Sequence, residues 1–337
     1  MATKVPQIAI LGAGLFVKTV YIPKLAEISH LFHLKAIWSR TQGSATAAVE
    51  IASEHFAGVE CKWGDSGIEE IIQDGSIDAV AIVLAGQNQV DFSLRLLKAG
   101  KHVIQGISEL ETALSSYQSI SAGSPGQLIW SVAENYRFES GLIEGKKLIA
   151  GIGKIITINL IMEASMPTSN PYYSTTWRHS FHIVGSEVAS VSARTSHVDL
   201  NLPPPDTLSS VFWRMDAQEC FQRLSTPKHP RQVFSWRFVG LNGTLHIEQC
   251  FERENGYLVS LHGADGQVKS SFFPSDGVVE ELKAFLSDVS EKALKKESDF
   301  VGEPRLSFVE GARDVAVIEA VFESAAKQGE VVQVKKY

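Results

Sequence analysis

Two short stretches of this 337-residue sequence carry residues that could bind the same ligand. The first is Gly12-Ala13-Gly14, which follows the apolar run QIAIL and precedes a helix-like segment. Gly12 would allow a tight turn, and Gly14 would let a pyrophosphate approach the free N–H groups at the start of the helix, with Leu15 and Phe16 beside it. In a strand–turn–helix context this pattern predicts a dinucleotide site, although Val17 replaces the usual third glycine. A purely structural glycine-rich turn is the alternative.

The second stretch is Ser39-Arg40-Thr41, at the end of the next apolar run. A site specific for NAD usually has an acidic residue here, which holds the ribose 2′-hydroxyl. This chain has no acid at the position. Arg40 could pair instead with a 2′-phosphate, and Ser39 and Thr41 could donate hydrogen bonds to it. The sequence therefore predicts NADP over NAD, with a solvated surface arginine as the alternative.

The elements that would position these residues alternate between strand and helix. Strands are expected over 7–11, 34–39, 59–63, 78–84, 102–105 and 128–133, with helical segments between them. Several of these runs are continuously apolar, which is typical of strands buried on both faces of a parallel sheet. We therefore predict an α/β fold for residues 1–137, a Rossmann domain with a doubly wound parallel sheet. Pro23 predicts that the first helix stops early and restarts.

The pattern changes after residue 138. A helix over 139–150 is followed by expected strands over 154–164, 189–199, 207–215, 232–239, 244–251 and 257–263, and two helices over 278–294 and 306–327 close the chain. Asn242-Gly243 is a strong signal for a two-residue hairpin turn. Residues 138–337 are therefore predicted to form an α+β domain with a large, open and mainly antiparallel sheet.

Two glutamines lie where strands of the first domain are expected to end. Ala85-Gly86-Gln87 ends the fourth strand and Gln105 ends the fifth. In an open α/β sheet ligands bind at the carboxyl ends of the strands, so Gln87 and Gln105 could hydrogen-bond the ribose or the nicotinamide amide. A structural role is the alternative for both.

Composition limits the classes of partner. The net charge of -7, without a block of like charge, argues against nucleic acid and anionic membranes as partners. No apolar stretch approaches the ~20 residues that span a bilayer, and the N-terminus does not resemble a signal peptide. The three scattered cysteines indicate a reduced compartment, so a cytoplasmic protein is expected. Two i,i+3 histidine pairs, at 30/33 and 179/182, have no accompanying cysteine or carboxylate cluster, so no metal is predicted.

Six sequence segments together resemble one family along nearly the whole chain. They are AILGAG, AGKHVIQ, VAENYRF, KKLIAGIGKI, VGLNGTLHI and the closing run from EPRLSFVEGARDVAVIE to EVVQV. They are similar to those of the glucose–fructose oxidoreductase / inositol dehydrogenase / MocA (Gfo/Idh/MocA) family. The resemblance implies NAD(P)-dependent hydride transfer to or from sugars, cyclitols or related carbonyl and alcohol compounds. It also implies a homo-oligomer formed through the open sheet of the second domain.

The resemblance also implies a set of substrate contacts at the junction of the two domains. In the family, the region that matches Asn135, Tyr136 and Arg137 lines the cleft for substrate and nicotinamide, and Trp177 and Arg178 lie in a second lining segment. For Asn135 to Arg137, hinge packing and a structural salt bridge are the alternative.

The sequence departs from the family at both places where the family carries its proton-transfer groups. After the strand at GKHV the family has Glu-Lys-Pro, but this chain has Gly106, Ile107 and Ser108, so isoleucine occupies the position of the catalytic lysine. After Trp-Arg the family has a helix with Asp-x-Gly-x-His. This chain reaches the next strand too soon for that helix, and His182 is only a weak substitute because no aspartate lies four positions before it.

Family-like sequence resumes on both sides of each gap, which suggests that whole segments are absent through alternative splicing or an imperfect gene model. Two functions therefore remain open. The first is an NADP(H)-dependent oxidoreductase acting on a small sugar-like or carbonyl/alcohol substrate. The second is a cofactor-binding protein without turnover: a pseudoenzyme, or a truncated isoform that lacks the catalytic lysine and histidine.

Overall fold

A computed structural model describes residues 5–84, 89–106, 116, 119–120, 128–163, 188–196, 207–215, 218–225, 233–251, 254–294, 300 and 302–336. The chain divides into two compact units. Met1–Asn135 and Val278–Ala312 form the first unit, and Tyr136–Gly277 and Arg313–Tyr337 form the second. The two helices near the C-terminus therefore belong to different units. Helix α7 (Gly277–Leu294) lies almost entirely in the first unit, and most of α8 (Phe308–Ala326) lies in the second.

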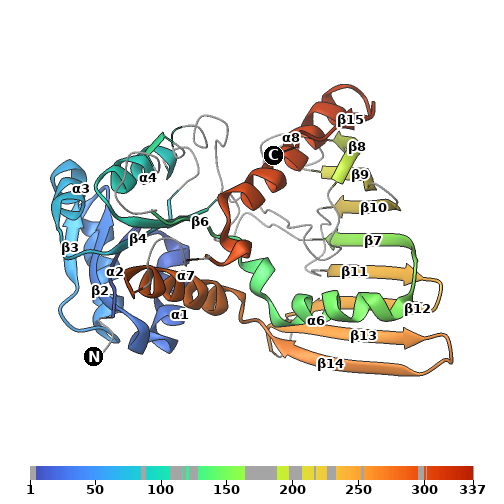
Figure 1. The fold of residues 1–337 in the computed structure, drawn as a ribbon, viewed down its shortest axis with the longest axis horizontal. Helices are drawn as coiled ribbons and strands as arrows, with labels where there is room; N and C mark the ends of the chain where they lie inside the picture. Colours follow the sequence, from blue (N-terminus) through green and yellow to red (C-terminus); the bar gives the residue numbers. More distant parts are fainter. Residues whose placement is uncertain are drawn as a thin grey trace. The chain divides into compact units, whose positions relative to one another are not determined.

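The first unit contains a six-stranded sheet in which every described pairing is parallel. Its strands are β1 (Gln7–Leu11), β2 (His33–Ser39), β3 (Glu60–Trp63), β4 (Ala79–Ile82), β5 (His102–Gln105) and β6 (Trp130–Val132). The order β3-β2-β1-β4-β5-β6 is that of a doubly wound Rossmann fold, as predicted (Figure 1). The inner strands β1, β4 and β5 are almost completely buried, as their apolar sequences require.

Helices connect the strands of this sheet. They are α1 (Ile22–Glu27), α2 (Gln42–Ser53), α3 (Gly64–Gln73) and α4 (Gln89–Lys98). The prediction that the first helix restarts with Pro23 in its first turn is confirmed by α1, but the helix does not stop before it, since helical backbone continues from Leu15 to Glu27. A wider π turn over Val17–Tyr21, closed by the bond from Ile22 N to Val17 O, precedes α1, and Pro23 lies within the first two residues of that helix. In the first turn of an α-helix the backbone N–H has no intrahelical acceptor, so the missing N–H of Pro23 costs few hydrogen bonds.

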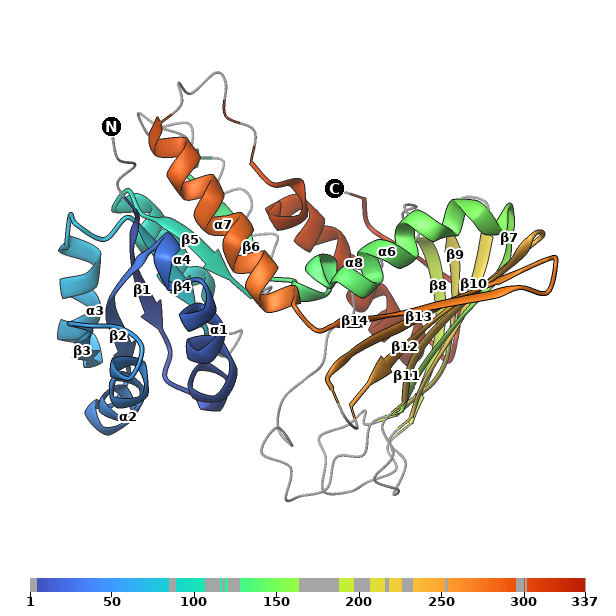
Figure 2. The same cartoon turned by 90° about the horizontal axis from the view of Figure 1, so that it is seen from below.

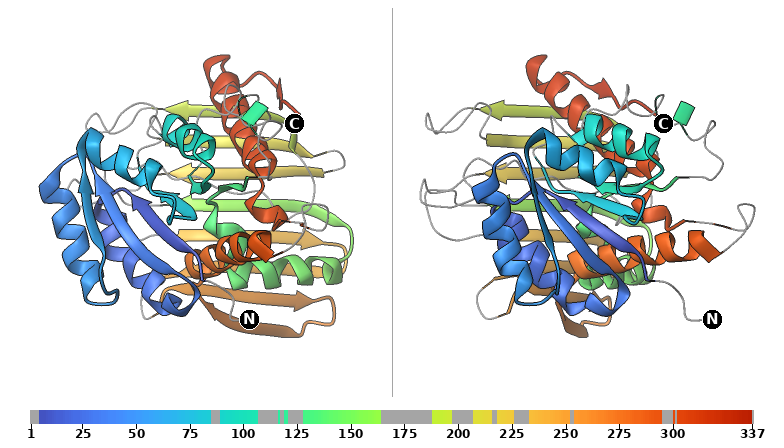
Figure 3. Two further views of the ribbon diagram at one scale, coloured as in Figure 1. Left: turned by 60° about the vertical axis from the view of Figure 1, so that its left-hand side comes forward. Right: turned by 90° about the vertical axis from the view of Figure 1, so that its left-hand side faces the viewer.

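The second unit contains a nine-stranded sheet. Its strands are β7 (Ile155–Glu163), β8 (Val188–Ser196), β9 (Thr207–Met215), β10 (Gln218–Ser225), β11 (Val233–Gly240), β12 (Gly243–Cys250), β13 (Gly256–Gly263), β14 (Val268–Pro274) and β15 (Val332–Gln333). Figures 1 and 3 show these strands side by side in the order β14-β13-β12-β11-β7-β10-β9-β8-β15. All described pairings are antiparallel except β7 with β10, so the predicted mainly antiparallel sheet is confirmed.

One face of this sheet packs on helices. Helix α6 (Ser140–Ile149) lies along it (Figure 2), and Gly141 allows close contact because a Cβ there would lie 2.5 Å from the Cβ of Tyr257. A hydrophobic cluster joins residues of α6 and α8 to alternate residues of the strands, including Phe234, Trp236 and Phe238 of β11. Burial of these large side chains is the main source of stability for this unit.

The hairpin between β11 and β12 confirms the expected turn but shifts it by one residue. Gly240 pairs with Gly243, so the two loop residues are Leu241 and Asn242. The preceding segment of the chain holds this turn, because Asn242 N donates to Ile152 O at 2.8 Å and Leu241 N donates to Lys154 O at 3.0 Å. These long-range hydrogen bonds hold Leu241 and Asn242 as the two loop residues. The local Asn-Gly pattern carries no information on such distant contacts.

Candidate functional site

The glycine-rich turn lies at the carboxyl end of β1, between the ends of β2 and β4. Gly12 N donates to Trp38 O at 2.8 Å, and Gly12 has a φ of 132°, a conformation that favours glycine. A Cβ on Gly12 would lie 2.2 Å from the carbonyl oxygen of Val83. Both the backbone conformation and the close approach of β4 therefore require glycine here.

The start of the following helix is open above this turn. A Cβ on Gly14 would meet nothing within 4 Å, and Leu15 and Phe16 are each 38% exposed. The first N–H groups of a helix have no intrahelical partner, and they carry a partial positive charge. Val17, in place of the third glycine, is fully buried within the unit. This cradle fits the pyrophosphate of a dinucleotide, because small residues leave the N–H groups accessible.

The end of β2 presents a hydroxyl and a cation beside the cradle. Trp38 is buried, and its Nε1 donates to Gly64 O at 2.8 Å, whereas Arg40 is exposed. Thr41 is the N-cap of α2: its Oγ1 accepts from Ser44 N at 3.4 Å and donates to Ser44 Oγ at 3.0 Å. The hydroxyl of Thr41 therefore serves the helix cap, which leaves Arg40 as the main polar group that this strand end presents to solvent.

Gln105 is buried at the end of β5, where only 1% of it is exposed. Its Oε1 accepts from Ser93 Oγ, and its buried Nε2 has no hydrogen-bond partner within the described part of the chain. Gln89 at the start of α4 is also buried and donates through Nε2 to Leu84 O. The bond to Ser93 favours the structural alternative for the Gln105 carbonyl, while its amide nitrogen remains available to a ligand or to neighbouring residues.

Asn135, Tyr136 and Arg137 lie in the 3₁₀ turn Asn135–Phe138 after β6. Arg137 forms an ion pair with Asp314 of α8, and the two side chains are only 1% and 7% exposed. Tyr136 packs against the hydrophobic cluster of the second unit. The geometry of Arg137 thus matches the structural salt bridge that the sequence left open. The sequence could not identify its partner, which lies 177 positions further along the chain.

The other predicted site residues lie outside the described residues. These are Gln87, Ile107, Trp177, Arg178 and His182. Gly106, just before the position of Ile107, is described, and a Cβ there would lie 3.3 Å from the Oε1 of Gln89.

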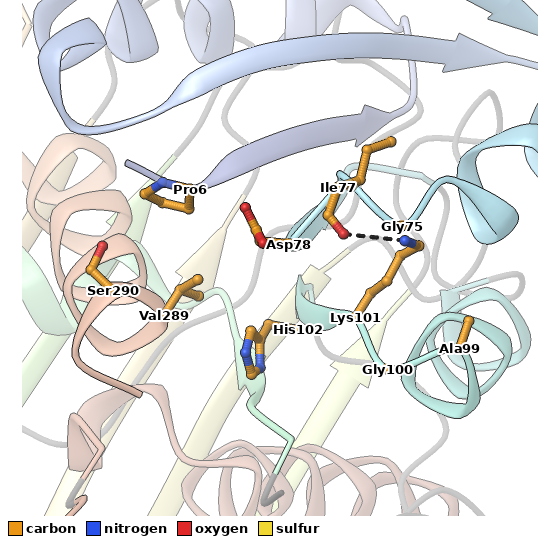
Figure 4. A pocket seen from close by; sticks show the side chains of 10 residues that line it. All are labelled: Pro6, Gly75, Ile77, Asp78, Ala99, Gly100, Lys101, His102, Val289 and Ser290. Carbon is orange, nitrogen blue, oxygen red and sulfur yellow. Dashed lines mark hydrogen bonds between the residues drawn. The ribbon is translucent and has the colours of Figure 1, made fainter. Parts of the chain in front are cut away.

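A cavity of about 260 Å³ lies at the opposite, amino-terminal edge of the first sheet (Figure 4). The residues that precede β1, β4 and β5 line it, among them Pro6, Asp78 and Lys101. The Lys101 ammonium group donates to the carbonyl oxygens of Asp74 at 2.6 Å and Ile77 at 3.1 Å, and burial lowers its pKa. Its hydrogen bonds to these loop carbonyls indicate a structural role at the edge where α/β sheets seldom bind ligands.

The described residues contain neither a candidate metal centre nor a helix that could span a membrane. Within them no three or more His, Cys, Asp or Glu side chains come together in a group that could hold a metal ion. None of the helices described is both long and apolar enough to cross a membrane.

The chain is similar to known oxidoreductases, in its first unit by a family model and along its length by individual proteins. A family model described as an oxidoreductase family with an NAD-binding Rossmann fold (Gfo/Idh/MocA) matches residues 7–106. The dehydrogenase FPY6 of Fusarium mangiferae is 26% identical over 366 residues, and the match covers 97% of this chain and 99% of that protein.

Solved structures share the fold of both units. An oxidoreductase of Thermotoga maritima is 22% identical with a TM-score of 0.76, over 98% of this chain and 99% of that one. Levoglucosan dehydrogenase, in a complex with NADH and levoglucosan, is 19% identical with a TM-score of 0.72, over 99% and 100% of the two chains. A variant of KijD10, a 3-ketoreductase of Actinomadura kijaniata in complex with TDP-benzene and NADP, is 16% identical with a TM-score of 0.70, over 95% and 98%. Residues 7–106 therefore match the Gfo/Idh/MocA oxidoreductase family with its NAD-binding Rossmann fold, and the chain as a whole has the fold of these solved structures.

Proposed function

We propose that this protein binds NADP(H) in preference to NAD(H) at the carboxyl edge of its first sheet. The observation that carries the proposal is the exposed Arg40 at the end of β2, where an acidic residue would be needed to bind the 2′-hydroxyl of NAD. A guanidinium beside the N-terminus of α2 offers charge and hydrogen-bond donors to a 2′-phosphate. Solved relatives include one bound to NADH and one bound to NADP, so either cofactor is compatible with the fold.

The reaction that fits the family is hydride transfer to or from a small hydroxyl or carbonyl compound. When bound, NADPH would donate a hydride from C4 of its nicotinamide, and NADP+ would accept one there. Gly12 and Gly14 would hold the pyrophosphate, and Asn135 and Tyr136 are proposed to line the substrate side. A small polyhydroxy substrate is proposed because levoglucosan dehydrogenase was solved with levoglucosan. Arg137 is proposed to act indirectly, because its charge is already paired with Asp314.

A second candidate function is binding of the cofactor without turnover, and a specific observation favours it. Gly106-Ile107-Ser108 follows β5, and none of these side chains has a pKa suited to proton transfer near neutral pH. The match to FPY6 runs over 366 residues, more than the 337 of this chain, so that relative has residues without a counterpart here. A missing general acid or base typically lowers a rate by about 10²–10⁴-fold, so turnover by this chain would be slow.

We also propose that this protein is cytoplasmic. We propose further that it forms a homo-oligomer through the sheet face opposite α6. Ile161 is 39% exposed, and its register partner Ser235 alternates along β11 with the core residues Phe234 and Trp236. Sedimentation velocity of the purified chain would test the oligomer, because a monomer at micromolar concentration would contradict it.

Calorimetric titration of the purified chain with NADPH and with NADH tests the proposed function. We expect saturable binding of NADPH at least tenfold tighter than that of NADH. Arg40→Ala should weaken NADPH binding by about tenfold and leave NADH binding nearly unchanged, and Lys62→Ala, a nearby cation that pairs with Glu60 and Glu70, is the matched control. Equal losses for both cofactors in Arg40→Ala would contradict the preference for NADP.

The choice between turnover and binding alone needs a separate assay. Oxidation of NADPH, or reduction of NADP, would be followed at 340 nm with a panel of sugars, cyclitols and ketoses. High activity with any of them would show that an unrecognised residue transfers the proton, and would rule out the candidate without turnover.

A further inference from the structure

The exposed indole of Trp63 has no role in the site described so far. Trp63 is the last residue of β3, at the same carboxyl edge as the glycine turn, and 42% of it is exposed. Tryptophan side chains are highly buried on average, so an indole this exposed beside the proposed ligand cradle is unusual. The sequence patterns showed only that residues 59–63 form a strand, and gave no reason to single out the last of them.

The sheet register places Trp63 next to the end of β2. Ser39 of β2 and Trp63 of β3 are direct partners in the parallel ladder, and adjacent strands lie about 4.8 Å apart. Because side chains alternate along a strand, Trp63 shares a face of the sheet with Cys61. The Sγ of Cys61 lies 3.6 Å from Thr46 Oγ1 in the second turn of α2, so this is the face that α2 covers. Trp63, nearer the carboxyl edge, therefore lies beside the N-terminal end of α2.

The backbone around Trp63 is held in place. Gly64 follows it with a φ of 63°, a left-handed conformation that turns the chain into α3. Trp38 Nε1 donates to the carbonyl oxygen of Gly64 at 2.8 Å, so a buried side chain of β2 anchors the turn that carries the exposed indole. The ring therefore projects from a rigid part of the unit, as a preorganised contact requires.

The order of strands implies which part of a dinucleotide would reach this ring. The pyrophosphate cradle lies at the end of β1, the residues suited to the 2′-position lie at the end of β2, and the next strand outward is β3. A dinucleotide whose pyrophosphate is on β1 and whose ribose is on β2 would direct its adenine toward β3. Aromatic rings bind nucleobases by stacking, which strengthens binding by roughly 5- to 150-fold per base.

We propose that Trp63 is a positioning residue for the cofactor, and that its indole stacks on the adenine ring. The proposal rests on the proposed function, since it assumes that a dinucleotide occupies the cradle. It assigns a different task to each of two neighbouring residues. Arg40 would distinguish NADP from NAD through the 2′-phosphate. Trp63 would strengthen the binding of both cofactors equally, because both carry adenine.

The test uses the full chain and titrates Trp63→Leu with NADPH, NADH and adenosine 2′,5′-bisphosphate, which carries the adenine but no nicotinamide. We expect about tenfold weaker binding of all three, and recovery to within about threefold in Trp63→Phe, whose ring can still stack. Adenosine 2′,5′-bisphosphate should quench less tryptophan fluorescence in Trp63→Phe than in the unchanged chain. Phe272→Leu, which removes another aromatic residue that is 40% exposed, on β14, is the control and should bind normally.

The outcomes separate a failure of the stacking role of Trp63 from a failure of the proposed function. If the unchanged chain binds NADPH and Trp63→Leu binds adenosine 2′,5′-bisphosphate equally well, the role of Trp63 is wrong and the proposed function stands. A loss confined to NADPH would also overturn the stacking role, because it would place the indole at the phosphate. If the unchanged chain binds neither cofactor, the proposed function itself fails. Circular dichroism and thermal unfolding of each variant would show whether a loss of binding reflects a loss of the fold.

Discussion

The two glycines of the cradle are needed for different physical reasons. Gly12 combines a φ of 132° with a close approach that would bring a Cβ to 2.2 Å from Val83 O. Gly14 has open space in the direction of a Cβ, so the fold itself tolerates a larger residue there. Gly12 is therefore required by the folded chain, whereas a requirement for Gly14 would come only from the proposed ligand.

A pair of alanine variants separates these two requirements. Gly12→Ala should lower the free energy of unfolding by at least about 2 kcal/mol and abolish NADPH binding, because the backbone is strained and β4 is displaced. Gly14→Ala should leave the unfolding free energy within about 1 kcal/mol and still weaken NADPH binding, since its methyl group lies where a pyrophosphate would approach. Urea unfolding and calorimetric titration of both variants are the measurements. Normal stability of Gly12→Ala would contradict the steric argument.

Asp288 on α7 is a half-buried carboxylate that holds the chain before α8. Its Oδ2 accepts from Glu303 N at 2.8 Å, and burial raises its pKa to about 6 from an ordinary value of 3.8. The folded state therefore holds this proton between about pH 4 and pH 6, where the unfolded state has lost it. Stability falls as the pH rises through this window, and the penalty is fully present above about pH 6.

Asp288→Asn keeps a hydrogen-bond acceptor and removes the charge. The variant should be more stable than the unchanged chain by roughly 1 kcal/mol at pH 7.5, a value that allows for the partial exposure of the group to solvent. The gain should disappear at pH 4, where the native carboxyl is also neutral. Urea unfolding at the two pH values measures both numbers. A gain of the same size at both would show that charge is not the cause.

At the scale of elements, one buried ion pair connects the turn after β6 to α8. Arg137 and Asp314 lie in the second unit with almost no exposure to solvent. Removing one member of such a pair leaves an uncompensated buried charge, whereas replacing both by apolar residues can be nearly neutral. The pair therefore determines how this turn and this helix fit together.

Asp314→Ala should destabilise the protein by about 3–5 kcal/mol, because it removes the carboxylate that pairs with the buried guanidinium of Arg137. The double variant Arg137→Met with Asp314→Leu should recover most of that loss. Urea unfolding of the single and double variants would show the difference. If Asp314→Ala unfolded like the unchanged chain, Arg137 would not depend on the pair and a direct substrate contact would regain support.

Most elements were predictable from sequence because their apolar residues recur with the period of the element they form. The predicted strands at 7–11, 102–105 and 207–215 agree residue for residue with β1, β5 and β9. β10 and β14 were not predicted. β14 is exposed along almost its whole length, so it shows no alternation of apolar and polar residues, and QECFQRLS of β10 likewise lacks a regular pattern.

At the scale of the whole molecule, the question is whether the proposed cofactor site is coupled to proton transfer. The Rossmann unit has an intact cradle, while the segment after β5 lacks the lysine that the family resemblance implies. Inserting Glu-Lys-Pro after Gln105 and restoring an Asp-x-Gly-x-His helix after Arg178 should raise the rate of hydride transfer by about 10²-fold or more. Each insertion alone should give less, because groups that act together are not additive.

The measurement is the steady-state rate of NADPH oxidation at saturating cofactor, compared with NADPH affinity in the same variants. The affinity should change little, because the cradle is untouched. A variant with both segments that binds NADPH but gains no activity would show that the resemblance does not extend to the chemistry of this chain.

The sequence by itself determined the Rossmann half and the position of its cradle. Those features depend on neighbours in the chain: apolar runs that must be buried, and glycines that permit one turn. Tertiary structure alone decided what Arg137 and Trp63 could do. Arg137 meets a partner 177 positions away, and Trp63 meets the site only because β3 lies beside β2. Such contacts depend on packing between distant segments, which no local pattern of residues encodes.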